Sequence, residues 1–380
     1  MRRKSWGLEE PVAAFNGILG NGLALRLLEN ALESDEVAHA YLFYGPSGVG
    51  KRTVAYRFGA ALVSGGDKSA KDRALRGLHP DLSEIEPEGQ FTTIGQVREV
   101  VRLAASRPFE GARRVFILQA DTLNVQAANA LLKTLEEPEG GALFVLLAAG
   151  REGVLPTIVS RAQTVRFDPV SRDEVSSFLV KRGHSEEEAR LAAALGRGSV
   201  GLALRYAEED ELRELREAVF GAGFAFGGSF EERYGAVEGI VARAEEVGAA
   251  REREYLVAHD EENDGGPDRR TREAAKRLGR AARDGAVAEA LELLALLYRD
   301  AAVVAAGAPE LAANVDRIEE IRAYVRERIG ADWAGATRAI GEARASLAYN
   351  VSPEAILEVT LSRTRRKIVR TSLPGSFPVS

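Results

Sequence analysis

Residues 124–138 read Asn-Val-Gln-Ala-Ala-Asn-Ala-Leu-Leu-Lys-Thr-Leu-Glu-Glu-Pro, and residues 156–161 read Pro-Thr-Ile-Val-Ser-Arg. Upstream of them, residues 45–51 read Gly-Pro-Ser-Gly-Val-Gly-Lys, which is the glycine spacing of a phosphate-binding loop. Glycines let successive backbone N–H groups turn toward one anion, and a following helix adds favourable partial charge. A loop of this kind between a strand and a helix indicates a nucleotide-binding core built on a parallel sheet.

The sheet itself is predicted from short apolar runs that alternate with helical patterns between about residues 11 and 168. The runs at 40–44, 114–118 and 143–147 are expected to be buried strands, and 164–167 could add another. Such strands between helices favour a parallel sheet covered on both faces.

Helix-start signals support this order of elements. Thr93 with Gln96 fits a capping box, and Asn124 can cap the helix that Pro138 ends. Ser171 and Ser185 each begin a further capping box, completed three residues later by a glutamate. A glycine-rich turn at 196–201 then leads into a third short helix.

The remainder of the chain is expected to be almost wholly helical, with Ser352, Pro353 and Glu354 marking the start of one helix. A charged stretch at 245–276 is expected to be solvated helix interrupted by a loop, and the tail after Arg370 is expected to be disordered. We therefore predict three domains: an α/β core at 11–168, a three-helix lid at 169–216 and an all-α oligomerisation domain at 217–370.

Composition excludes several classes of site. The chain of 380 residues has no cysteine, so disulfides, thiolate metal sites and cysteine nucleophiles are ruled out, and its four histidines lack ligand spacing. A net charge of −6 argues against gripping nucleic acid by bulk charge, although a local basic face is compatible with it. Neither a signal peptide nor a membrane-spanning stretch is evident, so a cytoplasmic location is expected.

The phosphate loop lacks one feature of a working ATPase. Lys51 would reach the outer phosphates, but the next position, where a hydroxyl binds magnesium, is Arg52, and Thr53 comes one residue late. The loop could hold ATP or ADP, or it could be only a strand-to-helix turn that has kept its shape. The candidate nucleotide-binding residues are Gly45, Ser47, Gly48, Val49, Gly50, Lys51, Arg52 and Thr53.

The acids needed for hydrolysis are also missing. A working enzyme ends its second strand with one acid for magnesium and another that polarises the attacking water. Leu118 and Gln119 occupy these places, and Asp121 is better placed as a turn or helix-entry residue. Hydrolysis by this chain alone is therefore not expected.

With these features the chain resembles the delta-prime family of bacterial DNA polymerase III clamp-loader subunits, which are AAA+ proteins. The residues that carry the resemblance are 48–53, 79–82 (His-Pro-Asp-Leu), 125–138 and 155–161, with weaker support from 297–300 and 347–353. It implies an AAA+ core, a lid and a helical collar that joins five subunits in a ring. It also implies motor (tau/gamma) and delta subunits and the sliding clamp as partners, with primed DNA reached through the assembled complex.

The resemblance further implies a stator with degenerate nucleotide chemistry. The lid position of a sensing arginine is Gly201 here, and the sensor position on the fourth strand is apolar, at or near Ala148. Two departures concern a zinc module, which residues 64–77 lack, so that no zinc is expected, and the Ser-Arg-Cys motif, whose third residue is Ala162.

Arg161 is the one candidate catalytic residue. By the resemblance it is an arginine finger that acts in trans on the ATP of the adjacent subunit, to which a planar guanidinium is suited. The alternative is a surface arginine paired with a local carboxylate. Gln126, Asn129 and Lys133 share one helix face, which could meet a partner subunit or DNA phosphate, or only solvent.

We interpret the sequence as a non-hydrolysing, stator-like subunit of the replicative clamp loader that helps to load the sliding clamp onto primed DNA. The alternative is an active AAA+ ATPase, either the motor subunit of the same loader or a helicase loader. A free-standing nucleic-acid-binding protein is disfavoured by the acidic balance.

Overall fold

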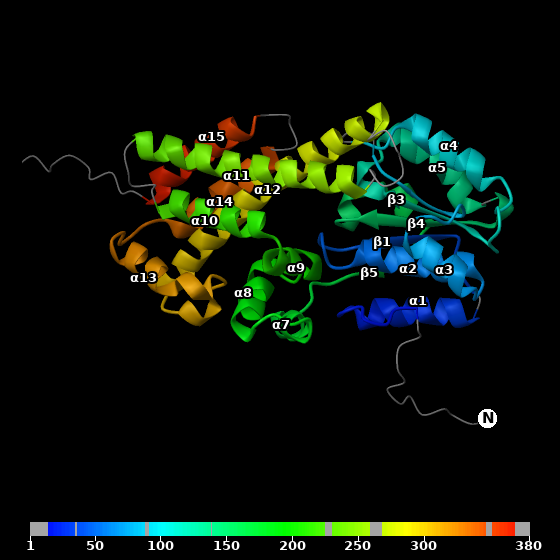
Figure 1. Cartoon of the computed structure of the whole chain (residues 1–380), viewed down its shortest axis with the longest axis horizontal. Coiled ribbons are helices and arrows are strands. Elements are labelled where there is room, and N and C mark those ends of the chain that lie inside the picture. The colour runs from blue at the N-terminus through cyan, green and yellow to red at the C-terminus, as the bar shows by residue number, and fades with distance from the viewer. Residues whose placement is uncertain are drawn as a thin grey trace, which may run out of the picture. The chain divides into compact units, whose positions relative to one another are not determined.

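The computed structural model describes residues 14–34, 36–87, 91–137, 139–224, 230–258, 268–346 and 352–368. The chain divides into two compact units, Met1–Leu204 and Arg205–Ser380, and each is described by itself (Figure 1). The fold class predicted from the sequence, a parallel α/β core followed by helices, is confirmed. The division into three domains stays a prediction.

The first unit contains a five-stranded parallel sheet in the order β2-β3-β4-β1-β5. The strands are β1 (Ala40–Tyr44), β2 (Leu82–Ile85), β3 (Arg114–Gln119), β4 (Ala142–Ala148) and β5 (Gln163–Arg166). The three strands predicted as buried are β1, β3 and β4, and the suggested fourth is β5. Strand β2 was not predicted from the sequence.

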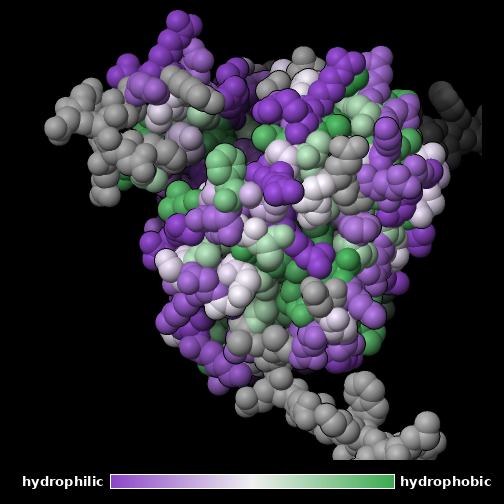
Figure 2. Space-filling view, turned by 90° about the vertical axis from the view of Figure 1, so that its right-hand side faces the viewer, coloured by the Kyte–Doolittle hydropathy of each residue, from purple (hydrophilic) through white to green (hydrophobic). Residues whose placement is uncertain are grey.

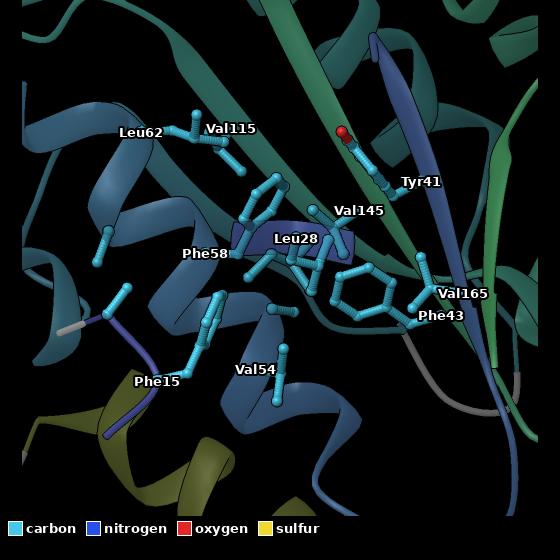
Figure 3. Packing of buried hydrophobic residues seen from close by; sticks show 14 of the residues in the cluster. Phe15, Leu28, Tyr41, Phe43, Val54, Phe58, Leu62, Val115, Val145 and Val165 are labelled. Atoms are coloured by element: carbon cyan, nitrogen blue, oxygen red, sulfur yellow. The ribbon is translucent and has the colours of Figure 1, made fainter. Parts of the chain in front are cut away.

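Helices cover both faces of this sheet, as Figure 1 shows. One face holds α1 (Gly22–Ser34), α2 (Lys51–Ser64) and α3 (Lys68–Leu75), and the other α4 (Ile94–Ala104), α5 (Val125–Glu136) and α6 (Pro156–Val159). Side chains alternate between the two cores because successive strand residues point to opposite faces. Figure 3 shows the first core, where Phe58 of α2 and Leu28 of α1 pack against strand side chains such as Phe43.

Three short helices complete the unit: α7 (Arg172–Lys181), α8 (Glu186–Gly196) and α9 (Val200–Glu208), with the boundary between the units inside α9. The capping boxes predicted at Thr93, Ser171 and Ser185 are all present. Asn124 caps α5 by accepting from the Ala127 N–H at 2.8 Å. Pro138, predicted to end that helix, lies outside the described residues.

A buried carboxylate ties β2 to the loop before β3. Asp81 is fully buried and accepts hydrogen bonds from the backbone N–H groups of Phe109, Glu110 and Gly111 at 2.7, 2.9 and 2.9 Å. The Arg114 guanidinium donates to it from Nε and Nη2, both at 3.2 Å. Burial opposes ionisation, but the three backbone donors and Arg114 outweigh it and hold the pKa of Asp81 below its usual value.

The second unit is helical: α10 (Asp210–Phe224), α11 (Phe230–Ala258), α12 (Arg269–Ala305), α13 (Ile318–Arg326), α14 (Trp333–Ser346) and α15 (Pro353–Ile368). Helices α11 and α12 approach closely at two glycines, since a Cβ on Gly248 would lie 2.7 Å from the Gly279 carbonyl oxygen. The helix start predicted at Ser352 is confirmed, because its hydroxyl accepts from the Ala355 N–H at 3.2 Å. Residues 259–267, within the charged stretch predicted to contain a loop, and the tail after Arg370 lie outside the described residues.

The described helices contain no segment long and apolar enough to cross a membrane. Within the same residues, no three histidine, cysteine or acidic side chains are grouped as a metal site would require. Figure 2 shows one side of the molecule, on which hydrophilic residues predominate and hydrophobic ones gather only in small patches.

Candidate functional site

A cavity of about 540 Å³ lies within the first unit, at the carboxyl ends of β1, β3 and β4. Ligands of open parallel sheets bind at this edge. The β1–α2 loop forms its floor, and residues of α7 and α9 also line it. The lining residues are Gly17, Ile18, Leu19, Ser47, Gly48, Val49, Gly50, Lys51, Arg52, Thr53, Arg57, Gln119, Asp121, Leu147, Ala148, Ala149, Phe178, Val200, Gly201 and Leu204.

The β1–α2 loop has the backbone of a phosphate-binding loop. Gly45, Gly48 and Gly50 all have positive φ, at 148°, 77° and 98°. At two of them close packing also excludes a side chain: a Cβ on Gly45 would lie 2.0 Å from the Phe167 carbonyl oxygen, and one on Gly48 would lie 1.9 Å from Ser199 Oγ. Seven of the eight candidate nucleotide-binding residues line the cavity; Gly45 is not among its lining residues.

Lys51 is folded onto its own loop. Its Nζ donates to the carbonyl oxygens of Gly45 and Pro46 at 2.6 and 2.7 Å. An ammonium has three protons, so one remains to meet an anion in the cavity. Burial lowers the pKa of Lys51, and the nearby Asp121 carboxylate opposes that shift.

Arg52 occupies the magnesium-hydroxyl position, and its guanidinium is committed to an ion pair. Its Nη2 and Nε donate to Oε2 of Glu84 on β2 at 2.6 and 2.8 Å, and the Tyr56 hydroxyl donates to the same oxygen at 2.7 Å. Burial and this carboxylate raise the pKa of Tyr56 to about 12. Thr53 also lines the cavity and is exposed.

The two positions at the end of β3 where an ATPase carries acids are Leu118 and Gln119, as the sequence analysis placed them, and a third residue, Asp121, lies nearby. Leu118 is buried in the second core, whereas Gln119 lines the cavity. Asp121 lies in a short turn (Ala120–Thr122), where its Oδ2 accepts from the Ala149 N–H at 2.9 Å. This turn residue nevertheless lines the cavity, as the one acid among the lining residues that the structure describes.

Several lining residues were not predicted from the sequence. Ile18, Leu19, Phe178 and Leu204 provide an apolar wall that suits the flat base of a nucleotide. Asn21, with φ 56°, fastens the loop from outside: its Nδ2 lies 3.4 Å from the Val49 carbonyl oxygen, and its Oδ1 accepts from the Asp168 N–H at 2.7 Å. The only signal was the turn-prone Gly20–Asn21 pair, which says nothing about its distant partner.

The two predicted sensor positions, Gly201 and Ala148, also line the cavity. Neither side chain can donate a hydrogen bond to a phosphate. Gly201 packs beside the loop, since a Cβ there would lie 3.9 Å from the Gly48 carbonyl oxygen.

Arg161 lies away from the cavity and holds a local ion pair. Its guanidinium binds the Glu136 carboxylate at the end of α5, and its Nη1 donates to the Thr157 carbonyl oxygen at 2.9 Å and to Ser160 Oγ at 3.2 Å. About a third of its side chain is exposed, at 32%. The alternative of an ion pair with a local carboxylate is therefore present in this chain. The role of Arg161 as a finger acting in trans stays a prediction.

Gln126, Asn129 and Lys133 are all exposed on α5, whereas Ala128 and Leu131 are buried beneath them. The shared polar face is confirmed. What this face contacts stays a prediction.

Comparison with known proteins gives a consistent set of relatives. Residues 20–171 match the sequence family described as DNA polymerase III, delta subunit. The DNA polymerase III subunit delta' of Bacillus subtilis is 32% identical over 203 residues, which are 51% of this chain and 61% of that protein. Its counterpart in Pseudomonas aeruginosa is 41% identical over 135 residues, which are 33% of this chain and 41% of that protein.

Other similar proteins are named as further DNA polymerase III subunits or as related to one. The DNA polymerase III subunit tau of Bacillus subtilis is 31% identical over 182 residues, which are 46% of this chain and 32% of that protein. This chain thus spans less than two thirds of each of these relatives. A solved structure of a gamma subunit-related protein from Thermotoga maritima aligns with 90% of this chain and 99% of its own, at 19% identity and a TM-score of 0.43.

Proposed function

We propose that this chain belongs to the delta-prime family of DNA polymerase III subunits and is a non-hydrolysing subunit of a clamp loader. The proposal is supported by the family match over residues 20–171 and by the similarity to two subunits named delta'. In this proposal it helps a motor subunit of the tau/gamma kind and a delta subunit to load the sliding clamp onto primed DNA. The helical region 217–370 would hold it in the ring of subunits.

One observation carries the proposal: the phosphate loop is intact, while the hydroxyl and the acid pair that would handle magnesium are replaced by other residues. Arg52 stands at the hydroxyl position and is paired with Glu84. Leu118 is in the core, Gln119 carries no charge, and Asp121 binds the Ala149 N–H. Phosphoryl transfer depends on positioning and charge neutralisation, so a cavity without a metal-binding set can hold phosphate without cleaving it.

A nucleotide is compatible with this cavity. Backbone N–H groups of the loop, the third proton of Lys51 and the start of α2 would meet the phosphates of ATP or ADP. The apolar wall would take the base. Bound nucleotide would then stabilise the packing of the loop against α9 instead of being consumed.

Arg161 is proposed to act on the ATP of a neighbouring subunit. Its bonds to the Thr157 carbonyl and Ser160 hydroxyl hold Nη1, and only the Glu136 pair, made by the other guanidinium nitrogens, would have to exchange for a phosphate. That pair is exposed, so the exchange costs little. An arginine held in this way would be ready to stabilise charge on the transferring phosphoryl group.

The alternative, an active ATPase, is favoured by one feature, the position of Asp121 in the cavity near Lys51. A carboxylate there could hold a cation through Oδ1 while Oδ2 still accepts from the Ala149 N–H.

ATP turnover by the purified chain with magnesium separates the two functions. We expect no turnover above that of a Lys51→Ala variant. Turnover of about one per second or faster, lost in both Lys51→Ala and Asp121→Asn, would establish the alternative. Nucleotide binding by the same samples, followed with a fluorescent ADP analogue, shows whether the cavity is intact.

A further inference from the structure

The second unit carries a row of basic residues on the N-terminal half of α12. Successive members are three, four, four and three residues apart, so they follow one side of the helix. At 1.5 Å per residue the row is about 21 Å long. We call it the α12 basic stripe; its members are Arg269, Arg272, Lys276, Arg280 and Arg283.

The centre of the stripe is available to a partner. Arg269 and Arg283 at its ends are paired with Glu273 and Asp284, each at 2.9 Å. Arg272 and Lys276 are exposed and have no carboxylate partner within the described part of the chain. Arg280 is exposed too, and its Nε only approaches the Lys276 carbonyl oxygen, at 3.4 Å.

The centre of the stripe does not stabilise the helix that carries it. Arg272, Lys276 and Arg280 are like charges four residues apart, which repel one another on a helix. Arg269 and Arg272 also lie in the first turn, where the helix dipole disfavours cations, and that turn of α12 has no acidic residue. A chain with a net charge of −6 thus concentrates cations where local structure disfavours them.

Acidic groups border the stripe but do not neutralise it. Glu252 of the neighbouring α11 faces α12, with Oε2 3.3 Å from where a Cβ on Gly279 would stand. Glu273 and Asp284 are turned away from the centre of the stripe by about 60–80° around the helix. The outward line of cations is therefore unbroken from Arg269 to Arg283.

We propose that the α12 basic stripe binds the phosphate backbone of duplex DNA. A straight row of guanidinium and ammonium groups suits a stiff polymer with closely spaced negative charges. No aromatic residue lies between Arg269 and Arg283, so single-stranded bases would find no stacking platform. The stripe also offers no apolar anchor of the kind on which protein interfaces depend, which disfavours an acidic protein as the partner.

This surface is independent of the nucleotide cavity, so the inference goes beyond the proposed function and can fail separately from it. The test uses the full chain and a labelled duplex of about 20 base pairs, with binding followed by fluorescence anisotropy over a range of salt concentrations. The test variant combines Arg272→Gln, Lys276→Gln and Arg280→Gln. The matched control removes as many exposed cations from α15, by Arg363→Gln, Arg365→Gln and Arg366→Gln.

We expect the stripe variant to bind at least about tenfold more weakly at low salt, and its salt dependence to fall by about three phosphate contacts. The α15 control should bind as the unmodified chain does. An equal loss of DNA affinity in both variants would show that binding depends only on the net charge of the chain. Unchanged affinity of the stripe variant would show that DNA binds elsewhere. Either result overturns the proposal. Displacement of the duplex by polyglutamate at equal charge concentration would also overturn it, in favour of an acidic protein partner. Circular dichroism of both variants confirms that α12 remains folded.

Discussion

Replacing Asp81 with alanine should destabilise the first unit more than any change on its surface. The carboxylate is fully buried, and it is the shared acceptor for three backbone N–H groups and the Arg114 guanidinium. Without it, the loop at residues 109–111 loses its attachment to β2. Buried donors without an acceptor carry their full desolvation cost.

The magnitude follows from which groups keep a partner. Removing one member of a buried ion pair costs about 3–5 kcal/mol. Arg114 still donates to the Leu103 carbonyl oxygen at 2.8 Å and to Ser106 Oγ at 2.7 Å, so its charge is only partly orphaned. We therefore expect a loss of about 3–4 kcal/mol for Asp81→Ala. Asp81→Asn keeps one acceptor oxygen and should lose about 2 kcal/mol.

Urea unfolding at neutral pH measures both losses. Far-UV circular dichroism follows the whole chain, and the fluorescence of Trp333, in a Trp6→Phe background, follows the second unit as an internal control. The transition reported by Trp333 should not move. A loss below about 1 kcal/mol for Asp81→Ala would refute the reasoning, because the carboxylate would then be dispensable.

The pH dependence gives a second check on the same residue. The pKa of Asp81 is lowered in the folded chain, so its contribution is complete above the unfolded value of about 3.9 and is lost as the pH falls through the folded value. The stability difference between the unmodified chain and Asp81→Asn should therefore shrink below about pH 4. A difference that stays constant down to acid unfolding would contradict this assignment.

Three other substitutions test the cavity and the second unit. Gly48→Ala should lower the free energy of unfolding by about 1–2 kcal/mol, because Gly48 has a positive φ. It should also weaken ADP binding, because the new Cβ would clash with Ser199 Oγ. Adding Ser199→Gly should restore ADP binding but not the lost stability. Arg52→Thr should restore the hydroxyl without creating ATP turnover, and turnover after this single change would contradict the role given to the missing acids. The free energy of unfolding should fall by less than about 1 kcal/mol, because the Arg52 side chain is 59% exposed. Asp300→Ala should lower the free energy of unfolding by about 2–4 kcal/mol, because this buried carboxylate accepts from the N–H groups of Ala313 and Asn314. Trp333 fluorescence measures the loss, and an unshifted unfolding transition would show that water replaces the carboxylate.

Structural features that depend on only a few neighbouring residues could be predicted from the sequence. The capping boxes at Thr93, Ser171 and Ser185 each involve one turn of chain, and all are present. Strands β1, β3 and β4 are continuous apolar runs because both of their faces are buried. Strand β2 was missed because only Leu82 of its four residues is buried, so it lacks such a run.

The candidate site could be predicted in part for the same reason. The phosphate loop is a local motif, and its glycines, Lys51 and Arg52 lie where the spacing placed them. What could not be predicted joins distant segments: Asp121 with Ala149, Arg52 with Glu84, and Gly48 with Ser199. No spacing rule links such pairs, since they meet only after the sheet has set the order of its strands.

Arg161 shows the limit of both approaches. The sequence allowed a finger acting in trans or a local ion pair, and this chain pairs it with Glu136. An exposed pair of this kind is weak, so its presence is compatible with transfer of the guanidinium to a stronger phosphate partner.

The central claim is that this chain serves a neighbour's ATP without turning over its own. The most direct test is DNA- and clamp-stimulated ATP turnover in a loader reconstituted with motor and delta subunits, comparing Arg161→Ala with Lys51→Ala in this subunit. We predict that Arg161→Ala slows turnover by less than the roughly 10³–10⁵-fold of a sole arginine finger, since several fingers share the ring, and that Arg161→Lys recovers little of it. Lys51→Ala should leave the rate unchanged. The reverse result, a rate that falls with Lys51→Ala and is indifferent to Arg161→Ala, would contradict the account.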